Sequence, residues 1–147
     1  DTLAELRLVP GMTDAIFQVL SKTITIYGES DKINILSASD DVLAALFFTC
    51  AKETALFQQP GFAHDLVQEW NRKKSEGTLQ ISAEGLISHL EQSSVIVDKE
   101  TCEKSVGTES KTFTIKSTAT VGSVTKTLLA RLRSAAGLTT LYQFQYL

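Results

Sequence analysis

The stretch ELRLVPGMTDAIFQVL, Glu5 to Leu20, carries two apolar-patterned segments separated by a Pro-Gly break. Pro10 and Gly11 end the first segment, because proline breaks a helix interior and glycine tolerates the backbone angles of a tight turn. Thr13 is a good N-cap for a helix that starts directly after it, with Asp14 in its first turn. The pattern predicts a helix-hairpin-helix whose turn consists of Val9, Pro10, Gly11, Met12 and Thr13.

Residues 1–95 read as a helical domain, of the SAM-like type, that carries this hairpin. Apolar side chains recur at helical spacing after Ser39, after the Pro60-Gly61 break and from Ser82 or Ala83 to about Gln92. The positions expected to be buried are Val42, Leu43, Leu46, Phe47, Phe62, Leu66, Val67, Trp70, Leu86, Ile87 and Leu90.

Residues 96–110 interrupt this pattern. The stretch DKETCEKSVGTESK, Asp98 to Lys111, is polar, rich in Ser and Thr and without periodicity, so we expect a linker loop and a domain boundary. Residues 111–147 then alternate with a period of two, with turn residues at Gly122 and at Ala136-Gly137. Three antiparallel strands are predicted near Phe113–Val121, Val124–Arg133 and Leu141–Leu147. The predicted fold class is α+β.

Charge is unevenly distributed along the chain. Residues 1–110 hold 9 Lys and Arg against 17 Asp and Glu, whereas residues 111–147 hold 5 Lys and Arg and no acid, giving −8 and +5. Such a basic module can bind an acidic partner, nucleic acid or anionic lipid, or it can pair with the acidic part of its own chain. Arg131 and Arg133 are the candidate partner-facing residues.

The two cysteines, Cys50 and Cys102, lie far apart and have no Cys or His neighbour at metal-ligand spacing. A zinc site is therefore not expected. Spacing leaves two alternatives open, a disulfide in an oxidising compartment or two buried thiols.

The hairpin lacks the residues of a DNA-binding hairpin. Such turns use two glycines around a hydrophobic residue, with Lys or Arg nearby, so that backbone N–H groups approach phosphate. Here Thr13 stands at the position of the second glycine, and Asp14 would repel a phosphate. We therefore expect a structural role and no nucleic-acid binding.

No catalytic constellation is recognisable, and no enzyme activity is expected. His64 and His89 lie on predicted helices, where solvent exposure is the ordinary case, and neither has a nucleophile or carboxylate at an interpretable spacing. The acidic residues of the expected loop could offer oxygen ligands to calcium, but the glycine and ligand spacing of an EF-hand are missing. These acids are Asp98, Glu100, Glu103 and Glu109.

The stretch LAELRLVPGMTDAIFQVLSKTITIYGESDKINILSASDDVLAAL resembles the minor pseudopilin K family of bacterial type II secretion, also called general secretion pathway protein K. The motif VPGMT, Val9 to Thr13, and the motif INILSAS, Ile33 to Ser39, carry the resemblance, together with Val42-Leu43. The basic strand LLARLRS and the aromatic strand LYQFQYL also look like that family's C-terminal antiparallel sheet.

This resemblance implies a non-enzymatic, pilin-like protein with a helical domain inserted before its last strands. Its implied place is the tip of a periplasmic pseudopilus, beside two other minor pseudopilins. Calcium binding in the pilin domain is implied as well, with no ligand residue of this chain assigned. The hairpin and the INILSAS pattern are also similar to DNA-uptake proteins, which makes a nucleic-acid-binding module the alternative.

The family's N-terminal apolar helix, first strand and first helical segments have no counterpart in this sequence. No run reaches the roughly 18 apolar residues of a membrane-spanning helix. We therefore expect a C-terminal portion of a periplasmic protein that is anchored in the inner membrane through a segment outside this chain. The apolar face of the sheet, with Phe113, Ile115, Leu128 and Tyr142 to Tyr146, is expected to need a cover.

Overall fold

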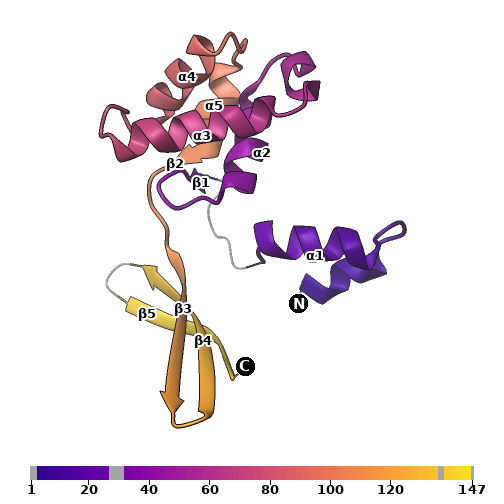
Figure 1. The fold of residues 1–147 in the computed structure, drawn as a ribbon, viewed down its shortest axis with the longest axis vertical. Coiled ribbons are helices and arrows are strands. Elements are labelled where there is room, and N and C mark those ends of the chain that lie inside the picture. Colours follow the sequence, from indigo (N-terminus) through magenta and orange to yellow (C-terminus); the bar gives the residue numbers. More distant parts are fainter. Residues whose placement is uncertain (1–2, 27–31, 136–137, 147) are drawn as a thin grey trace. The chain divides into compact units, whose positions relative to one another are not determined.

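The computed structural model describes residues 3–26, 32–135 and 138–146 (Figure 1). These residues form two units. A helical unit holds 3–26 and 32–109, and a sheet unit holds 110–135 and 138–146. The predicted α+β layout, with helices followed by a three-stranded antiparallel sheet, is confirmed. The boundary between the units falls after Glu109.

The helical unit contains seven helical segments in its described part and one short parallel pair of strands. The helices are η1 (Leu3–Leu8), α1 (Asp14–Thr23), α2 (Asp40–Cys50), η2 (Ala55–Gln58), α3 (Phe62–Ser75), α4 (Ala83–Gln92) and α5 (Lys99–Ser105), where η marks a 3-10 helix. The strands are β1 (Ile33–Asn34) and β2 (Val106–Gly107), which pair in parallel.

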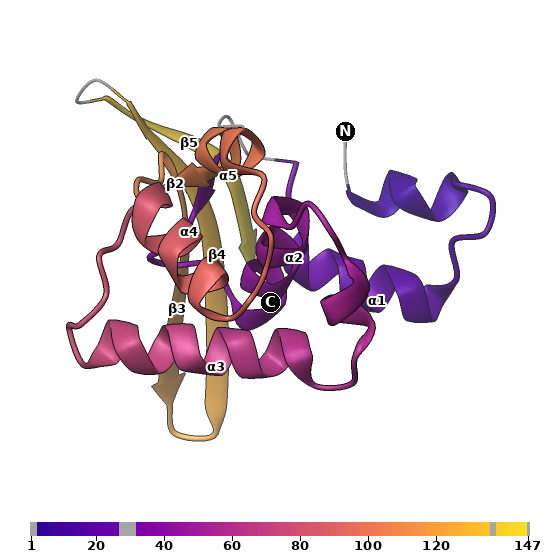
Figure 2. The ribbon, with the colours of Figure 1, turned by 90° about the horizontal axis from the view of Figure 1, so that it is seen from above.

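The core of this unit lies between α2, α3, α4 and α5. Helices α2, α4 and α5 all lie on one side of helix α3 (Figures 1 and 2). The largest side chains in the core are Trp70 and Phe47, whose rings meet edge to face with centroids 6.0 Å apart. The buried hydrophobic residues are Ile35, Leu43, Leu46, Phe47, Cys50, Leu66, Val67, Trp70, Leu86, Ile87, Leu90, Val95, Cys102 and Val106.

Two expected core residues, Val42 and Phe62, are only half-buried. On α2 the buried stripe is Leu43, Leu46, Phe47 and Cys50, so the helix is turned slightly away from the expected face. Helix α4 begins where its cap predicts, because the Ser82 hydroxyl accepts a hydrogen bond from the Gly85 N–H at 3.2 Å.

The prediction of an irregular loop after Asp98 is wrong for residues 99–105, which form α5. Asp98 caps this helix by accepting hydrogen bonds from the Thr101 N–H at 3.1 Å and from the Thr101 hydroxyl at 2.9 Å. An ion pair between Glu100 and Lys104, 2.6 Å apart, spans one turn of the helix. Only Cys102 of α5 is buried, so the segment shows no apolar periodicity.

The sheet unit is a meander in the order β3 (Thr112–Val121), β4 (Val124–Ala135) and β5 (Leu138–Tyr146), antiparallel throughout. A two-residue turn joins β3 to β4, and Gly122 takes the positive φ of 60° that such a turn requires. The register between β4 and β5 shifts at Arg131 and Leu132. The turn expected at Ala136-Gly137 lies outside the described residues.

Candidate functional site

The hairpin turn is closed by backbone hydrogen bonds and a capped helix. The Val9 N–H donates to the Leu6 carbonyl at 3.1 Å, and the Met12 N–H donates to the Val9 carbonyl at 3.0 Å. Gly11 has a φ of 89°, a conformation in which a residue with a side chain is strained. The first expected helix is a 3-10 helix, η1.

The first turn of α1 is unfavourable for binding an anion. The Thr13 hydroxyl already accepts a hydrogen bond from the Ile16 N–H at 3.2 Å. The Asp14 carboxylate lies in the first turn, 3.6 Å from the guanidinium of Arg7, and Arg7 also stacks 4.2 Å above the Phe17 ring. Arg7, the arginine of the hairpin, is thus paired with a carboxylate of the hairpin itself and not with a phosphate.

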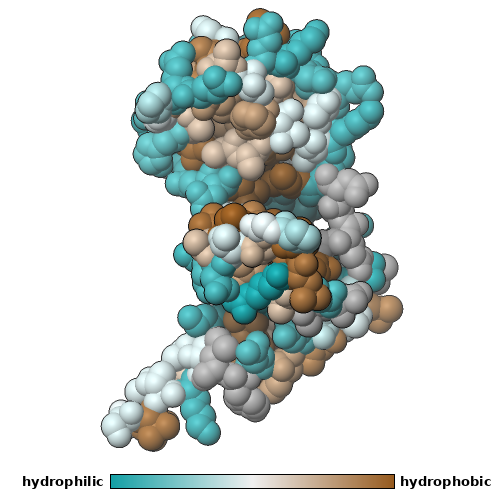
Figure 3. All heavy atoms as spheres, turned by 90° about the vertical axis from the view of Figure 1, so that its right-hand side faces the viewer, coloured by the Kyte–Doolittle hydropathy of each residue, from teal (hydrophilic) through white to brown (hydrophobic). Residues whose placement is uncertain are grey.

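The described hairpin has no buried residue on either of its helices. Its exposed hydrophobic side chains include Leu8, which is 83% exposed, and Val19, which is 64% exposed. On the side of the molecule drawn in Figure 3, hydrophobic patches likewise interrupt the hydrophilic surface. The hairpin therefore presents apolar side chains and a carboxylate, which suits packing against protein better than contact with a polyanion.

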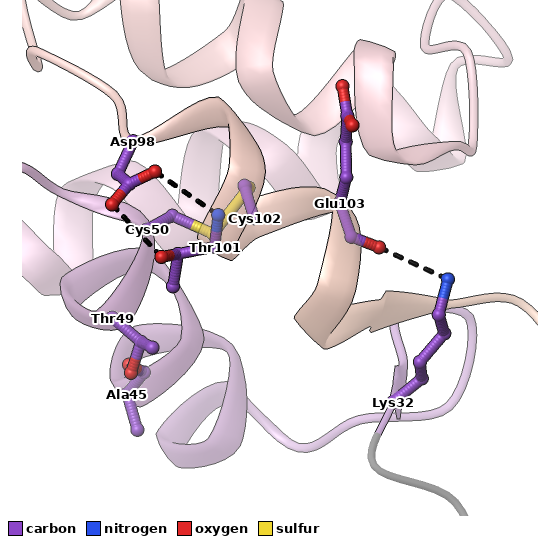
Figure 4. The surroundings of a disulfide bond; sticks show 8 residues. All are labelled: Lys32, Ala45, Thr49, Cys50, Asp98, Thr101, Cys102 and Glu103. Carbon is purple, nitrogen blue, oxygen red and sulfur yellow. Dashed lines mark hydrogen bonds between the residues drawn. A yellow bond between two sulfur atoms is a disulfide. The ribbon is translucent and has the colours of Figure 1, made fainter.

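Cys50 and Cys102 form a disulfide that joins the last residue of α2 to the middle of α5 (Figure 4). Both side chains are fully buried. Backbone hydrogen bonds reinforce the link, because the Asp98 N–H donates to the Cys50 carbonyl at 2.8 Å and the Lys52 N–H donates to the Ile96 carbonyl at 2.8 Å. The backbone N–H of Thr101, followed by its hydroxyl, lowers the pKa of Asp98, so this cap is ionised near neutral pH.

Most of the acidic segment that was expected to be a loop is a capped helix, α5. Asp98 is the cap, and the backbone carbonyl of Glu103 accepts from the Lys32 ammonium at 3.1 Å (Figure 4). Glu100 pairs with Lys104. Among the described residues, no group of three or more His, Cys, Asp or Glu side chains could hold a metal ion. Calcium binding stays a prediction that rests on the resemblance alone.

The two histidines lie in different environments. His64, on α3, is exposed as expected. His89, on α4, is 2% exposed, so the expectation of a solvated histidine is wrong for this residue. Its position follows from the spacing of Leu86, His89 and Leu90, which puts the imidazole on the apolar face of the helix.

The sheet has two chemically different faces, which the register defines because directly paired residues share a face. The apolar face contains Phe113, Ile115, Ser117, Ala119, Val121, Val124, Lys126, Leu128, Ala130, Leu132, Leu141 and Phe144. Several of these side chains are open to solvent, with Phe113 47%, Ile115 50% and Phe144 52% exposed. Tyr142 lies at the register shift, and the side chain of Tyr146 is outside the described part.

The opposite face, here called the threonine-basic face, contains Thr112, Thr114, Lys116, Thr118, Thr120, Thr125, Thr127, Leu129, Arg131, Arg133, Thr140, Gln143 and Gln145. Hydroxyl pairs cross it, with 3.1 Å between Thr118 and Thr127. Arg131 donates to the side-chain carbonyl of Gln143, and both Arg131 and Arg133 are half-buried. The two candidate partner-facing arginines therefore lie on one face, alternate with the apolar residues of β4, and share that face with Lys116.

The sequence matches no family model and no curated protein, and the fold matches no solved structure. No helix among the described residues combines the length and the apolar character that crossing a membrane requires.

The sequence reasoning missed α5 and the burial of His89. The sequence does contain a signal for α5. Asp98 is a good N-cap residue with Thr101 three positions later, and Glu100 precedes Lys104 by one helical turn. The helical spacing of His89 with Leu86 and Leu90 was the local signal for its burial. Its hydrogen bond to the Leu66 carbonyl of α3 is non-local, so no local pattern reveals it.

Proposed function

We propose that this chain belongs to a minor pseudopilin of the K type, a non-enzymatic structural protein at the tip of the type II secretion pseudopilus. The observation that carries the proposal is the three-stranded antiparallel sheet that follows the helical unit and leaves its apolar face exposed. A pilin-type sheet of this kind is one part of a larger packed unit, and the rest of that unit would come from segments outside this chain.

The motif INILSAS supports the proposal because its Asn34 and Ile35 have defined structural tasks. Ile35 is fully buried in the helical core. The side-chain carbonyl of Asn34 accepts from the Leu36 N–H at 3.0 Å, and its backbone carbonyl accepts from the Ala38 N–H at 3.0 Å. Ser39 occupies the N-cap of α2, where its backbone carbonyl accepts from the Leu43 N–H at 2.9 Å and its side chain makes no capping hydrogen bond. The motif therefore builds the entry into α2, which explains why a family with this helical domain would share it.

The exposed apolar face supports assembly with other protein segments. Large aromatic and aliphatic side chains on one face of an antiparallel sheet are stabilising only when that face is covered. With the apolar face covered, the threonine-basic face would be left for neighbours. Residues 111–147 carry five Lys and Arg and no acid, so an acidic surface on a neighbouring pseudopilin is the complementary partner.

The buried disulfide agrees with the same assignment. Disulfides form and persist in oxidising compartments such as the bacterial periplasm. The periplasm is also where the tip of a pseudopilus is assembled in the resembling family. Localisation there, with an inner-membrane anchor outside this chain, is part of the proposal.

A reconstitution experiment tests the proposal. The soluble part of the protein encoded by this gene is mixed with the soluble parts of the other two minor pseudopilins from the same genome. Size-exclusion chromatography with light scattering should give one complex that contains all three. Arg131→Ala should weaken this complex, whereas Lys126→Ala, an equal change of charge on the apolar face, should leave it intact.

Two outcomes would contradict the proposal. One is the absence of any complex with either pseudopilin at micromolar concentration. The other is salt-sensitive, submicromolar binding of duplex DNA that Gly11→Asp abolishes, because it would favour the DNA-uptake alternative.

A further inference from the structure

His89 is a titratable group enclosed in the core of the helical unit. Its ring lies 5.8 Å from the Phe47 ring of α2 and 5.4 Å from the Trp70 ring of α3, measured between centroids. The Nε2 atom lies 3.0 Å from the backbone carbonyl oxygen of Leu66, also on α3. The imidazole of α4 therefore contacts both of the other two helices that form this part of the core.

The hydrogen bond to the Leu66 carbonyl fixes the tautomer of the neutral imidazole. A carbonyl oxygen only accepts, so Nε2 carries the hydrogen and Nδ1 of the neutral ring does not. Nδ1 is buried and has no hydrogen-bond partner in the described structure. A second proton on His89 would create a buried N–H donor without an acceptor, next to two aromatic rings, which is a costly arrangement.

The charged groups around His89 would not stabilise the positive charge of a protonated imidazole. Lys73 and Glu69, both on α3, act on the ring with opposite signs. The Lys73 ammonium reaches over to α4, 3.0 Å from the side-chain carbonyl of Gln92. Glu69 is bound by the Arg72 guanidinium at 2.7 Å and lies 3.7 Å from Lys73, so its charge is already neutralised.

The remaining acids on the helices that surround the ring are exposed, namely Asp40 and Asp41 on α2, Asp65 on α3, and Glu84 and Glu91 on α4. Asp40 accepts a hydrogen bond from Asn71 at 2.9 Å, and Glu91 pairs with Lys99 at 3.0 Å. None of them bonds to the imidazole. Burial is the main reason why the pKa of His89 lies below its ordinary value.

We propose that His89 is an acid-sensitive latch of the helical unit, whose protonation loosens the packing of α4 against α2 and α3 in mildly acidic conditions. The direction of the change in stability with pH follows from proton linkage. The unfolded chain takes up the proton near pH 6.5, whereas the folded unit disfavours it. The stabilisation is therefore complete above that pH and is lost as the pH falls below it. The carboxylates of Glu69, Glu84 and Asp98 also have lowered pKa values, but they change the stability only in more acidic solution.

Chemical denaturation of the whole chain tests the latch directly, because Trp70 is its single tryptophan and lies against His89. Because the folded unit disfavours the proton, the unfolding equilibrium constant should rise between pH 7.5 and pH 5, up to a limit of about 30-fold if the folded state binds no proton at His89 in this range. His89→Gln keeps an amide donor for the Leu66 carbonyl but cannot titrate, so it should remove most of this dependence. His64→Gln, a change of the exposed histidine, should retain it.

The proposal is overturned if His89→Gln unfolds with the same pH dependence as the native chain. If His89→Gln does not fold, the ring proton resonances of the native chain decide the matter, with His64→Gln used to assign them. A His89 signal that stays fixed from pH 7.5 to pH 5 in the folded protein supports the latch. A signal that titrates near pH 6.5 without unfolding overturns it.

Discussion

Replacing both Cys50 and Cys102 with alanine removes the covalent link between the end of α2 and the middle of α5. The two cysteines are separated by 52 positions, and the segment between them contains η2, α3 and α4. Without the link, the unfolded chain gains the freedom of a loop of that length. The folded state keeps its hydrogen bonds between residues 50–52 and 96–98 but loses the contacts of two fully buried sulfur atoms.

The magnitude follows from the loop length. For a loop of 52 residues, the chain-entropy relation gives a loss of about 4 kcal/mol in the free energy of unfolding. In a domain of 60–100 residues, each kcal/mol shifts the melting temperature by about 4–8 °C, so we expect a decrease of about 15–30 °C. A loss of this size is comparable to the whole stability of many small domains.

Denaturant titration followed by Trp70 fluorescence measures this loss, with the native protein kept free of reductant. Thr49→Ala is the matched control, since Thr49 is exposed on the same turn of α2 and its hydroxyl bonds only to the Ala45 carbonyl within that helix. The control should stay within about 0.5 kcal/mol of the native protein. A double variant that loses less than about 1 kcal/mol would refute the reasoning, as would two free thiols in native protein purified without reductant.

Three further predictions follow from local geometry. Gly85→Ala should destabilise the helical unit by about 1–3 kcal/mol in denaturant titration, because a Cβ there would collide with the Gln80 carbonyl, whereas the exposed Ser88→Ala should be neutral. Leu128→Asp should lower thermal stability or change the oligomeric state, whereas Gln145→Asp, an exposed change on the threonine-basic face, should do neither. An unaffected Leu128→Asp would show that the apolar face needs no cover. Fluorescence titration with duplex DNA at about 0.15 M salt should show nothing tighter than the nonspecific range of about 10⁻⁴–10⁻⁶ M.

The elements with strong periodic patterns could be predicted from the sequence. Helix α4 begins after Ser82 and the sheet strands alternate as expected, because each has a cap or turn residue and a regular apolar face that agree. The antiparallel meander followed from Gly122 at the turn and from the alternation on either side of it. These features are local, so one sequence is sufficient to reveal them.

The features that could not be predicted depend on contacts between distant residues. Helix α5 buries only Cys102 and is held by a disulfide from α2, which no periodicity displays. Sequence spacing does not decide between a disulfide and two thiols, because the pairing depends on the fold bringing the Cα atoms of Cys50 and Cys102 within 4.8 Å of each other. His89 is likewise defined by the Leu66 carbonyl and by two rings on other helices.

Deletion of the gene for this protein in its source organism tests the proposed secretion function most directly. If the chain is part of a minor pseudopilin, the deletion strain should retain in its periplasm the enzymes that type II secretion normally exports, and a plasmid copy should restore their export. Complementation by a Cys50→Ala, Cys102→Ala copy should be impaired, because the helical unit would be marginally stable. Undiminished export of the type II substrates from the deletion strain would contradict the account.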